Sequence, residues 1–237
     1  MDSWARNRRA LQEHLKSNDL ADFINWSTIQ ATMFVGDVGY VRKEYAEIMT
    51  DKQFTGSVIE ETKAGHPPLM WGWTSGNLIH QYYHLKQWLD LTRQDIREMG
   101  SIVEVGAGYG AMALICHRLG FKGRYFIFDL PELVRLQRYY LWETIGDLDT
   151  IYWSFPLELC DLFIASHSLN EMPVVERERL LSQVAAKEYL FASSYEFDGV
   201  NNQDYFEQMA GSIQGIDWKF YPHRHQENAF YMVGIQL

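Results

Sequence analysis

Three glycines at alternate positions lie in the segment EVGAGYG, residues 104–110, directly between an apolar run and an amphipathic one. Glycine at such a turn permits positive φ angles and lets a ligand approach the backbone closely. The start of the following helix offers unpaired N–H groups to electronegative atoms. The segment therefore predicts a cofactor-binding loop. Its predicted contacts are Glu104, Gly106, Ala107, Gly108, Tyr109 and Gly110.

The charge of Glu104 decides which cofactor suits this loop. Gly106, Gly108 and Ala111 also fit the dinucleotide fingerprint G-x-G-x-x-G/A. A carboxylate at position 104 would repel a pyrophosphate, whereas it would attract the ammonium and sulfonium groups of S-adenosylmethionine (SAM). We therefore predict SAM as cofactor, with S-adenosylhomocysteine (SAH) as its spent form. A nicotinamide cofactor on the same loop is the alternative.

A second carboxylate, Asp129, ends the next apolar run. A carboxylate there can accept hydrogen bonds from both ribose hydroxyls of an adenosine ligand. The purely structural interpretation is an N-cap for the helix that begins near Pro131. The order of strand, glycine turn, helix, strand and acid favours the cofactor role.

His167 is the predicted general base, in the segment SHSLNE, residues 166–171. Methyl transfer to oxygen is an in-line displacement, so the acceptor must be aligned and an alcohol must lose its proton. The unperturbed pKa of histidine, about 6.5, leaves a neutral imidazole available for this at physiological pH. Asn170 and Glu171 are the predicted orienting group and alternative base. A structural role for His167 is equally compatible with the sequence.

Aromatic and basic side chains in two other segments are candidates for contact with the methyl acceptor. Aromatic faces suit sugar rings, and the planar fork of Arg224 could hold a carboxylate or phosphate. A solvated turn is the alternative interpretation of residues 223–225. The predicted acceptor contacts are Trp73, Tyr82, His84, His223, Arg224 and His225.

No metal site is predicted. His80 and His84 are four residues apart and share a helical face, but the segment lacks the acidic partner of the H-E-x-x-H motif. A metal that assists O-methylation needs hard oxygen ligands beside the acceptor. The fourth expected strand, residues 161–166, instead ends at Ser166 and is followed by His167, where an aspartate would be needed.

A mostly parallel, doubly wound α/β sheet of seven strands must position these residues. From Ser101 onward, short apolar runs alternate with amphipathic stretches, the pattern of βαβ units. The last two strands are joined by only residues 223–228, which is too short for a parallel crossover and predicts an antiparallel hairpin. Strands are expected at 101–105, 124–129, 150–153, 161–166, 188–193, 217–222 and 229–237, and helices at 111–119, from 131, and at 174–186 and 203–212.

The first 97 residues differ from the rest. They contain helix-period segments at 10–16, 20–32 and 77–91 and no run of buried strands. We therefore expect an N-terminal helical extension or lid at residues 1–97, followed by a SAM-binding domain at 98–237.

Composition and charge exclude several functional classes. The chain has 237 residues, of which 47% are hydrophobic, as in an ordinary globular protein. Its formal net charge of −10 disfavours nucleic acid and anionic membrane surfaces as partners. The two cysteines, Cys116 and Cys160, form no metal-type pair, and a reducing, cytoplasmic setting is expected. No signal peptide or membrane-spanning stretch is expected either.

Two strings, residues 102–141 (IVEVGAGYGAMALICHRLGFKGRYFIFDLPELVRLQRYYL) and 161–173 (DLFIASHSLNEMP), resemble the putative sugar O-methyltransferase family of Class I enzymes. The resemblance extends over roughly residues 76–237. It implies the Rossmann-like Class I fold, assigns Leu130 with Asp129 to the cofactor, and places Ser154 and Phe155 beside the adenine. A core position for Phe155 is equally compatible with the sequence.

Together these observations predict a SAM-dependent methyltransferase that acts on a hydroxyl of a small, sugar-containing molecule. An NAD-dependent oxidoreductase that uses the same loop is one alternative, and a competition between NADH and SAM separates the two. A methyltransferase-like module that binds SAM without catalysis is another. The intact glycine loop and the polar segment after the fourth strand weigh against it.

Overall fold

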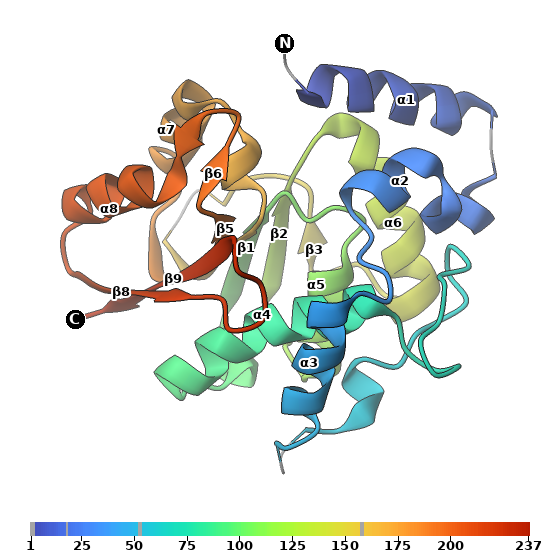
Figure 1. Ribbon diagram of the computed structural model, residues 1–237, viewed down its shortest axis with the longest axis horizontal. Helices are drawn as coiled ribbons and strands as arrows, with labels where there is room; N and C mark the ends of the chain where they lie inside the picture. The colour runs from blue at the N-terminus through green and yellow to red at the C-terminus, as the bar shows by residue number, and fades with distance from the viewer. Residues whose placement is uncertain (1–2, 18, 52–53, 157–158) are drawn as a thin grey trace. The chain divides into compact units, whose positions relative to one another are not determined.

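The computed structural model describes residues 3–17, 19–51, 54–156 and 159–237 (Figure 1). Internal contacts divide the chain into two compact units, which are described separately. The helical unit comprises Met1–Tyr83, Gly108–Arg118 and Asp129–Leu148, and the sheet unit comprises His84–Ala107, Leu119–Phe128 and Asp149–Leu237. The expected domain boundary at residue 97 stays a prediction.

A seven-stranded sheet in the order β3-β2-β1-β4-β5-β9-β8 forms the centre of the sheet unit (Figure 1). Strands β1 to β5 pair in parallel, and β9 pairs antiparallel with both β5 and β8. The predicted mostly parallel sheet with an antiparallel end is confirmed. The strands are β1 (Ser101–Val105), β2 (Arg124–Phe128), β3 (Ile151–Tyr152), β4 (Cys160–Ser166), β5 (Ala186–Ser194), β8 (Ile216–Pro222) and β9 (Ala229–Gln236).

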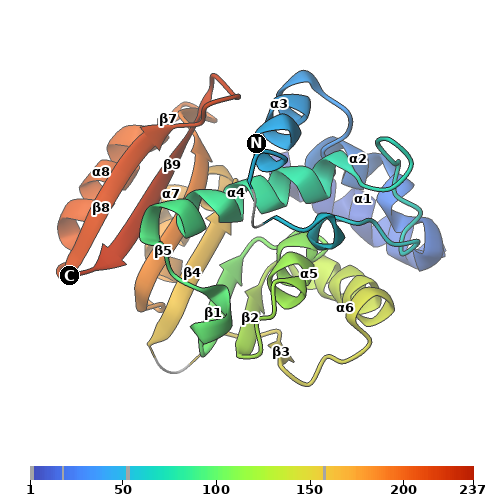
Figure 2. The same ribbon diagram turned by 90° about the horizontal axis from the view of Figure 1, so that it is seen from below.

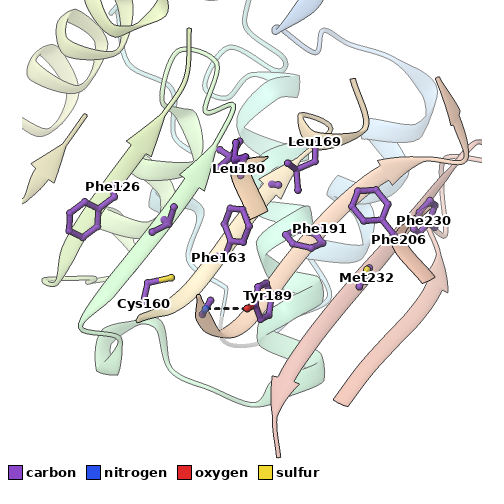
Figure 3. Close-up of a cluster of buried hydrophobic side chains, with 14 residues drawn as sticks. Phe126, Cys160, Phe163, Leu169, Leu180, Tyr189, Phe191, Phe206, Phe230 and Met232 are labelled. Carbon is purple, nitrogen blue, oxygen red and sulfur yellow. Dashed lines mark hydrogen bonds between the residues drawn. The ribbon is translucent and has the colours of Figure 1, made fainter. Parts of the chain in front are cut away.

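Within the sheet unit, helices cover both faces of the sheet, as a doubly wound fold requires. Helices α7 (Val174–Leu181) and α8 (Asn202–Ser212) lie on one face of the sheet (Figure 2). Their residues Leu180 and Phe206 pack there against Phe163 and Phe191 (Figure 3). Alternate strand residues point to the opposite face. There, Trp88 Nε1 of α4 (Gly76–Thr92) donates a hydrogen bond to Glu188 Oε2 at 2.6 Å.

Helices form the second unit. Helix α6 begins with Pro131 in its first turn and ends at Gly146, whose φ of 80° is the left-handed conformation that favours glycine. Arg8 of α1 forms an ion pair of 3.0 Å with Glu132 of α6. The elements of this unit are α1 (Ser3–Ser17), η1 (Leu20–Asn25), α2 (Ser27–Thr32), α3 (Gly39–Ile48), η2 (Gly56–Val58), α5 (Ala111–Arg118), α6 (Pro131–Ile145) and the first half of α4.

Among the described residues, no helix is both long enough and apolar enough to cross a bilayer.

Several predicted boundaries are wrong, for physical reasons. The helix expected at 174–186 ends at Leu181, because Ala186 pairs with Cys160 and so begins β5 earlier than expected. The helical segment expected at 20–32 breaks at Trp26, whose ψ of 136° is extended. Strand β2 ends at Phe128, so Asp129 follows the strand, and Cys160 belongs to β4.

A short hairpin was not anticipated. Strands β6 (Glu196–Phe197) and β7 (Val200–Asn201) pair antiparallel around Asp198 and Gly199, which have φ angles of 50° and 79°. Asp-Gly between short strands is a strong hairpin signal because both central residues need positive φ. The helix α3 and the 3₁₀ segment η3 (Ile96–Glu98) were also missed.

A buried arginine fixes the chain after β4. The side chain of Arg177, on α7, is 1% exposed, and burial lowers its pKa. Its guanidinium donates to the carbonyl oxygens of Asn170 and Met172 and to Asn202 Oδ1 at 2.6–2.7 Å. Two of these hydrogen bonds hold the segment that follows His167, at Asn170 and Met172, and the third ties α7 to the start of α8.

We expect Arg177→Ala to lower the free energy of unfolding by about 3–5 kcal/mol, since three buried acceptors lose their donors. Urea denaturation measures the change. Arg179→Ala on the same helix is the control, because Arg179 is 67% exposed and forms an ion pair with Glu176 at the surface, a contact worth about 0–1 kcal/mol. Equal losses in the two variants would contradict the assignment.

Candidate cofactor and acceptor site

Gly106 begins the predicted cofactor loop under tight steric constraint in the sheet unit. Its φ is +71°, and its N–H donates to the carbonyl oxygen of Phe128 at 2.9 Å. A Cβ built at this position would lie 2.2 Å from the Cβ of Ser168. The hydroxyl of Ser168 donates to the carbonyl oxygen of Val105, which holds the serine against the turn. Only glycine satisfies both the dihedral angle and the space.

The second half of the loop is bonded to Asp129 within the helical unit. The Gly108 N–H donates to Asp129 Oδ2 at 3.0 Å, and Leu130 N–H donates to Oδ1 at 2.7 Å. Gly108 has a φ of +59° and Gly110 a φ of +102°. The N-cap of α6 is Leu130, so the structural interpretation of Asp129 as N-cap is wrong. The carboxylate instead fixes the loop.

Tyr109 anchors the loop by its side chain. The ring is 2% exposed and lies 4.8 Å from that of Tyr140 and 5.5 Å from that of Phe23, all in the helical unit. Its hydroxyl accepts a hydrogen bond from Asn77 Nδ2 at 2.7 Å, and burial raises its pKa well above the usual range. The side chain therefore holds the loop in place. The cofactor contact expected at Tyr109 stays a prediction.

Glu104 is a buried strand residue, 3% exposed, four residues into β1. Its Oε2 accepts a hydrogen bond of 2.8 Å from the hydroxyl of Tyr125 on β2. A buried carboxylate favours a cationic ligand nearby, so the predicted attraction for SAM keeps its physical basis.

Ser154 and Phe155, the predicted adenine contacts, follow β3. The ring of Phe155 stacks on Phe128 at 4.1 Å between centroids, with an interplanar angle of 22°. Phe128 is the last residue of β2 and precedes Asp129. An aromatic surface thus lies at the end of β2 in the sheet unit.

Three predicted residues, His84, His167 and His223, gather in the sheet unit. The ring centroid of His84 lies 5.4 Å from that of His167 and 6.0 Å from that of His223. His84 Nδ1 lies 2.8 Å from the hydroxyl of Tyr231, a buried residue of β9 whose ring is 5.1 Å from His223. The sheet thereby brings together the predicted base and two predicted acceptor contacts.

His167 has a φ of +53°, in the left-handed region that few non-glycine residues adopt, histidine more often than most. Its N–H donates to the carbonyl oxygen of Ala192 at 2.8 Å, which extends the pairing of β4 with β5 by one residue. Such strain costs about 1–3 kcal/mol and clusters at functional sites.

Hydrogen bonds fix one histidine tautomer. His223 Nδ1 accepts from the N–H groups of His225 and Gln226 at 3.2 and 3.1 Å. The neutral ring therefore carries its proton on Nε2. Arg224 and His225 lie in the turn after β8, as predicted.

Asn170 is built into the fold more firmly than the sequence suggested. It is 2% exposed, and its Nδ2 donates to Ser194 Oγ at 2.9 Å. Glu171 ends the 3₁₀ segment η4 (Leu169–Glu171) and is partly exposed. Neither role predicted for this pair, orienting group or alternative base, is tested by these contacts.

Two predicted acceptor contacts lie in the helical unit. The ring of Trp73 lies 6.3 Å from that of Tyr45, and that of Tyr82 lies 5.1 Å from that of Phe54. His80 Nδ1, also in this unit, lies 3.0 Å from both carboxylate oxygens of Glu44. The acceptor roles of Trp73 and Tyr82 stay predictions.

Sequence reasoning missed Gln137, Tyr231 and Ser168. Gln137 interrupts the apolar face of α6, and a polar residue at such a position is a usable signal. Tyr231 is one of several alternating residues of β9 and has no distinctive pattern. Ser168 lies beside the predicted base, but its contact with Gly106 depends on the pairing of β1 with β4.

No protein-family profile matches the sequence, and no curated protein is similar to it. Solved structures match in fold. The magnesium protoporphyrin IX methyltransferase of Synechocystis PCC 6803, solved with bound SAM, aligns with 98% of this chain and 97% of its own, at a TM-score of 0.54 and 11% identity. The chain has the fold of the SAM-dependent methyltransferases.

A second structure of this methyltransferase fold is that of the glycopeptide N-methyltransferase MtfA. It aligns with 66% of this chain and 90% of its own, at a TM-score of 0.52 and 13% identity. These alignments establish the methyltransferase fold, and identities this low say nothing about the methyl acceptor. The narrower resemblance to sugar O-methyltransferases gains no support from them.

We expect Gly106→Ala to lower the free energy of unfolding by about 2–4 kcal/mol, from the positive φ together with the contact on Ser168. Gly72→Ala is the control, because Gly72 has a φ of +78° and open space around it. It should lose only about 1 kcal/mol.

Adding Ser168→Gly to Gly106→Ala should restore part of that stability, since it removes the atom in closest contact. Urea denaturation of the single and double variants measures the coupling. Simple additivity of the two losses would contradict the steric explanation.

Proposed function

We propose that this chain is a SAM-dependent methyltransferase. The observation that carries the proposal is the glycine loop itself, in which the Gly108 N–H is bonded to the carboxylate of Asp129. The loop lies at the carboxyl ends of β1 and β2, where ligands of open α/β sheets bind. The buried carboxylate of Glu104 suits a cationic cofactor and disfavours a diphosphate.

The residues present fit SAM. Glycine is required at 106 because a Cβ would meet Ser168, and the positive φ angles of Gly106, Gly108 and Gly110 give the turn the shape of a ligand-binding loop. SAM supplies an electrophilic methyl group carried on a sulfonium. Glu104 and residues 106–110 would hold its methionine part, Asp129 and Leu130 its ribose, and Ser154 and Phe155 its adenine.

We assign the proton transfer to His167. The side chain of a deprotonated base must reach the acceptor hydroxyl at the carboxyl edge of the sheet, and His167 directly follows β4. His84 lies beside it, and His223 lies on another side of His84; both would orient the acceptor. Asn170 and Glu171 follow in the same segment, as orienting group and alternative base.

The acceptor we propose is a hydroxyl of a small, sugar-containing molecule. The aromatic rings of Trp73 and Tyr82 and the basic turn of Arg224 and His225 support such a ligand. The net charge of −10 disfavours nucleic acids and anionic membranes. The two buried thiols, Cys116 and Cys160, support a reducing, cytoplasmic setting.

The purified protein should bind SAH in isothermal titration calorimetry, and Asp129→Ala should weaken that binding at least about tenfold, since charged hydrogen bonds to ribose are lost. Asp217→Ala is the matched control, because Asp217 forms an exposed ion pair with Lys219 of the same strand, β8. Binding of NADH in place of SAH would overturn the proposal.

His167→Asn should keep the affinity for SAH and lower turnover about a hundredfold or more, because the general base is lost. Asparagine is chosen because it tolerates the positive φ at this position. Radiolabelled methyl transfer to a panel of glycosides measures turnover. Full activity in the variant would move the base to Glu171 or to solvent.

A further inference from the structure

We propose that Gln137 is a positioning residue for the cofactor loop, acting through the Gly108 backbone and the Asp129 carboxylate. The inference rests on the proposed function, since it concerns the same SAM site. No feature of the loop motif itself points to this residue.

The amide of Gln137 bridges two parts of the chain that lie 21 residues apart (129 − 108). Its Nε2 donates to the carbonyl oxygen of Gly108 at 2.9 Å and to Asp129 Oδ2 at 2.9 Å. The same Oδ2 accepts from the Gly108 N–H at 3.0 Å. Gln137, Gly108 and Asp129 thus form a closed ring of hydrogen bonds within the helical unit.

The chemistry of the bridge demands an amide. A glutamine NH₂ group has two protons, one for each of the two acceptors, and carries no charge. Ionised glutamate has no proton to donate and would repel Asp129, whereas a lysine would add a positive charge beside the site of a cationic cofactor. An apolar side chain would leave both acceptors without this donor.

Gln137 is buried, so its amide group depends on hydrogen bonds within the protein. Gln137 is 0% exposed, and its neighbours on the buried face of α6 are Leu133, Leu136, Tyr140 and Leu141. A buried amide costs free energy unless it is hydrogen-bonded. A leucine would suit this face as well for packing alone, so the amide serves its two polar partners.

The ring holds Gly108 in its left-handed conformation and sets the plane of the Asp129 carboxylate before a ligand arrives. Ordering a loop on binding costs affinity, and ordering it beforehand avoids that cost. Gln137 therefore contributes to affinity for SAM and SAH by acting through Asp129 and Gly108.

The test is a double-mutant cycle on SAH affinity by calorimetry, with Gln137→Met, Asp129→Asn and the double variant. We expect Gln137→Met to weaken binding about tenfold, as for one lost hydrogen bond to a charged group. The double variant should bind within about twofold of Asp129→Asn alone, because the two residues act as one. Additive losses would overturn the proposal. Gln137→Glu should be no better than Gln137→Met.

Tyr140→Phe is the matched control. Tyr140 lies on the same helix, is 0% exposed, and its hydroxyl has no hydrogen-bond partner among the described residues. The change removes one buried hydroxyl from α6 and leaves the hydrogen bonds among Gln137, Gly108 and Asp129 intact, so SAH affinity should stay within twofold of wild type. A tenfold loss in this control would mean that Gln137 acts only through general helix packing.

Hydrogen exchange without ligand separates this inference from the proposed function. Amides of residues 106–110 should exchange faster in Gln137→Met than in wild type and should not change in Tyr140→Phe. Unchanged exchange in Gln137→Met overturns the positioning role even if SAH binds. If wild type binds no SAH while exchange behaves as expected, the proposed function fails and the loop is held for another ligand.

Discussion

The hydrogen bond of 3.0 Å between the Gly108 N–H and Asp129 Oδ2 sets the form of the cofactor loop. The acceptor is a carboxylate, so the bond is stronger than one between neutral groups. A second hydrogen bond lies just before it in the chain, from the Gly106 N–H to the carbonyl oxygen of Phe128. Within the sheet unit, β1 pairs with β2 in the register Val105 to Phe128, directly before Gly106 and Asp129 in the chain.

Much of the fold could be predicted from local pattern, because strands buried on both faces are continuous apolar runs. β1 is buried along its whole length. Its place between β2 and β4 depends on long-range pairing, and the local pattern did not predict it. Boundaries fail where a distant partner decides them. Ala186 joins β5 because Cys160 pairs with it, although its local sequence favours helix. The hairpin at Asp198-Gly199 has a local sequence signal, the Asp-Gly pair, but it was not among the predicted elements.

The candidate site divides in the same way. The loop and Asp129 follow from a motif placed between a strand and a helix, which the sequence contains directly. The contact of His84 with Tyr231 joins residues 147 positions apart, and Gln137 matters only because α6 turns it toward Gly108. No local pattern encodes such contacts, since they depend on how distant elements pack. Sequence can therefore nominate the groups that do chemistry more easily than those that hold them.

The two ends of the parallel strands carry polar groups of different kinds. At the start of β4, burial raises the pKa of Asp161, but Lys187 and the N–H groups of Gly100 and Ser101 outweigh it, so the pKa lies below its usual range. That carboxylate is fully engaged in holding strands together. At the other end of β4 stands His167, with its strained backbone. A left-handed backbone persists where neighbouring pairing over-determines it. The hydrogen bond from the His167 N–H to the carbonyl oxygen of Ala192 supplies that restraint, so a carboxylate network fixes one end of β4 and backbone pairing fixes the other.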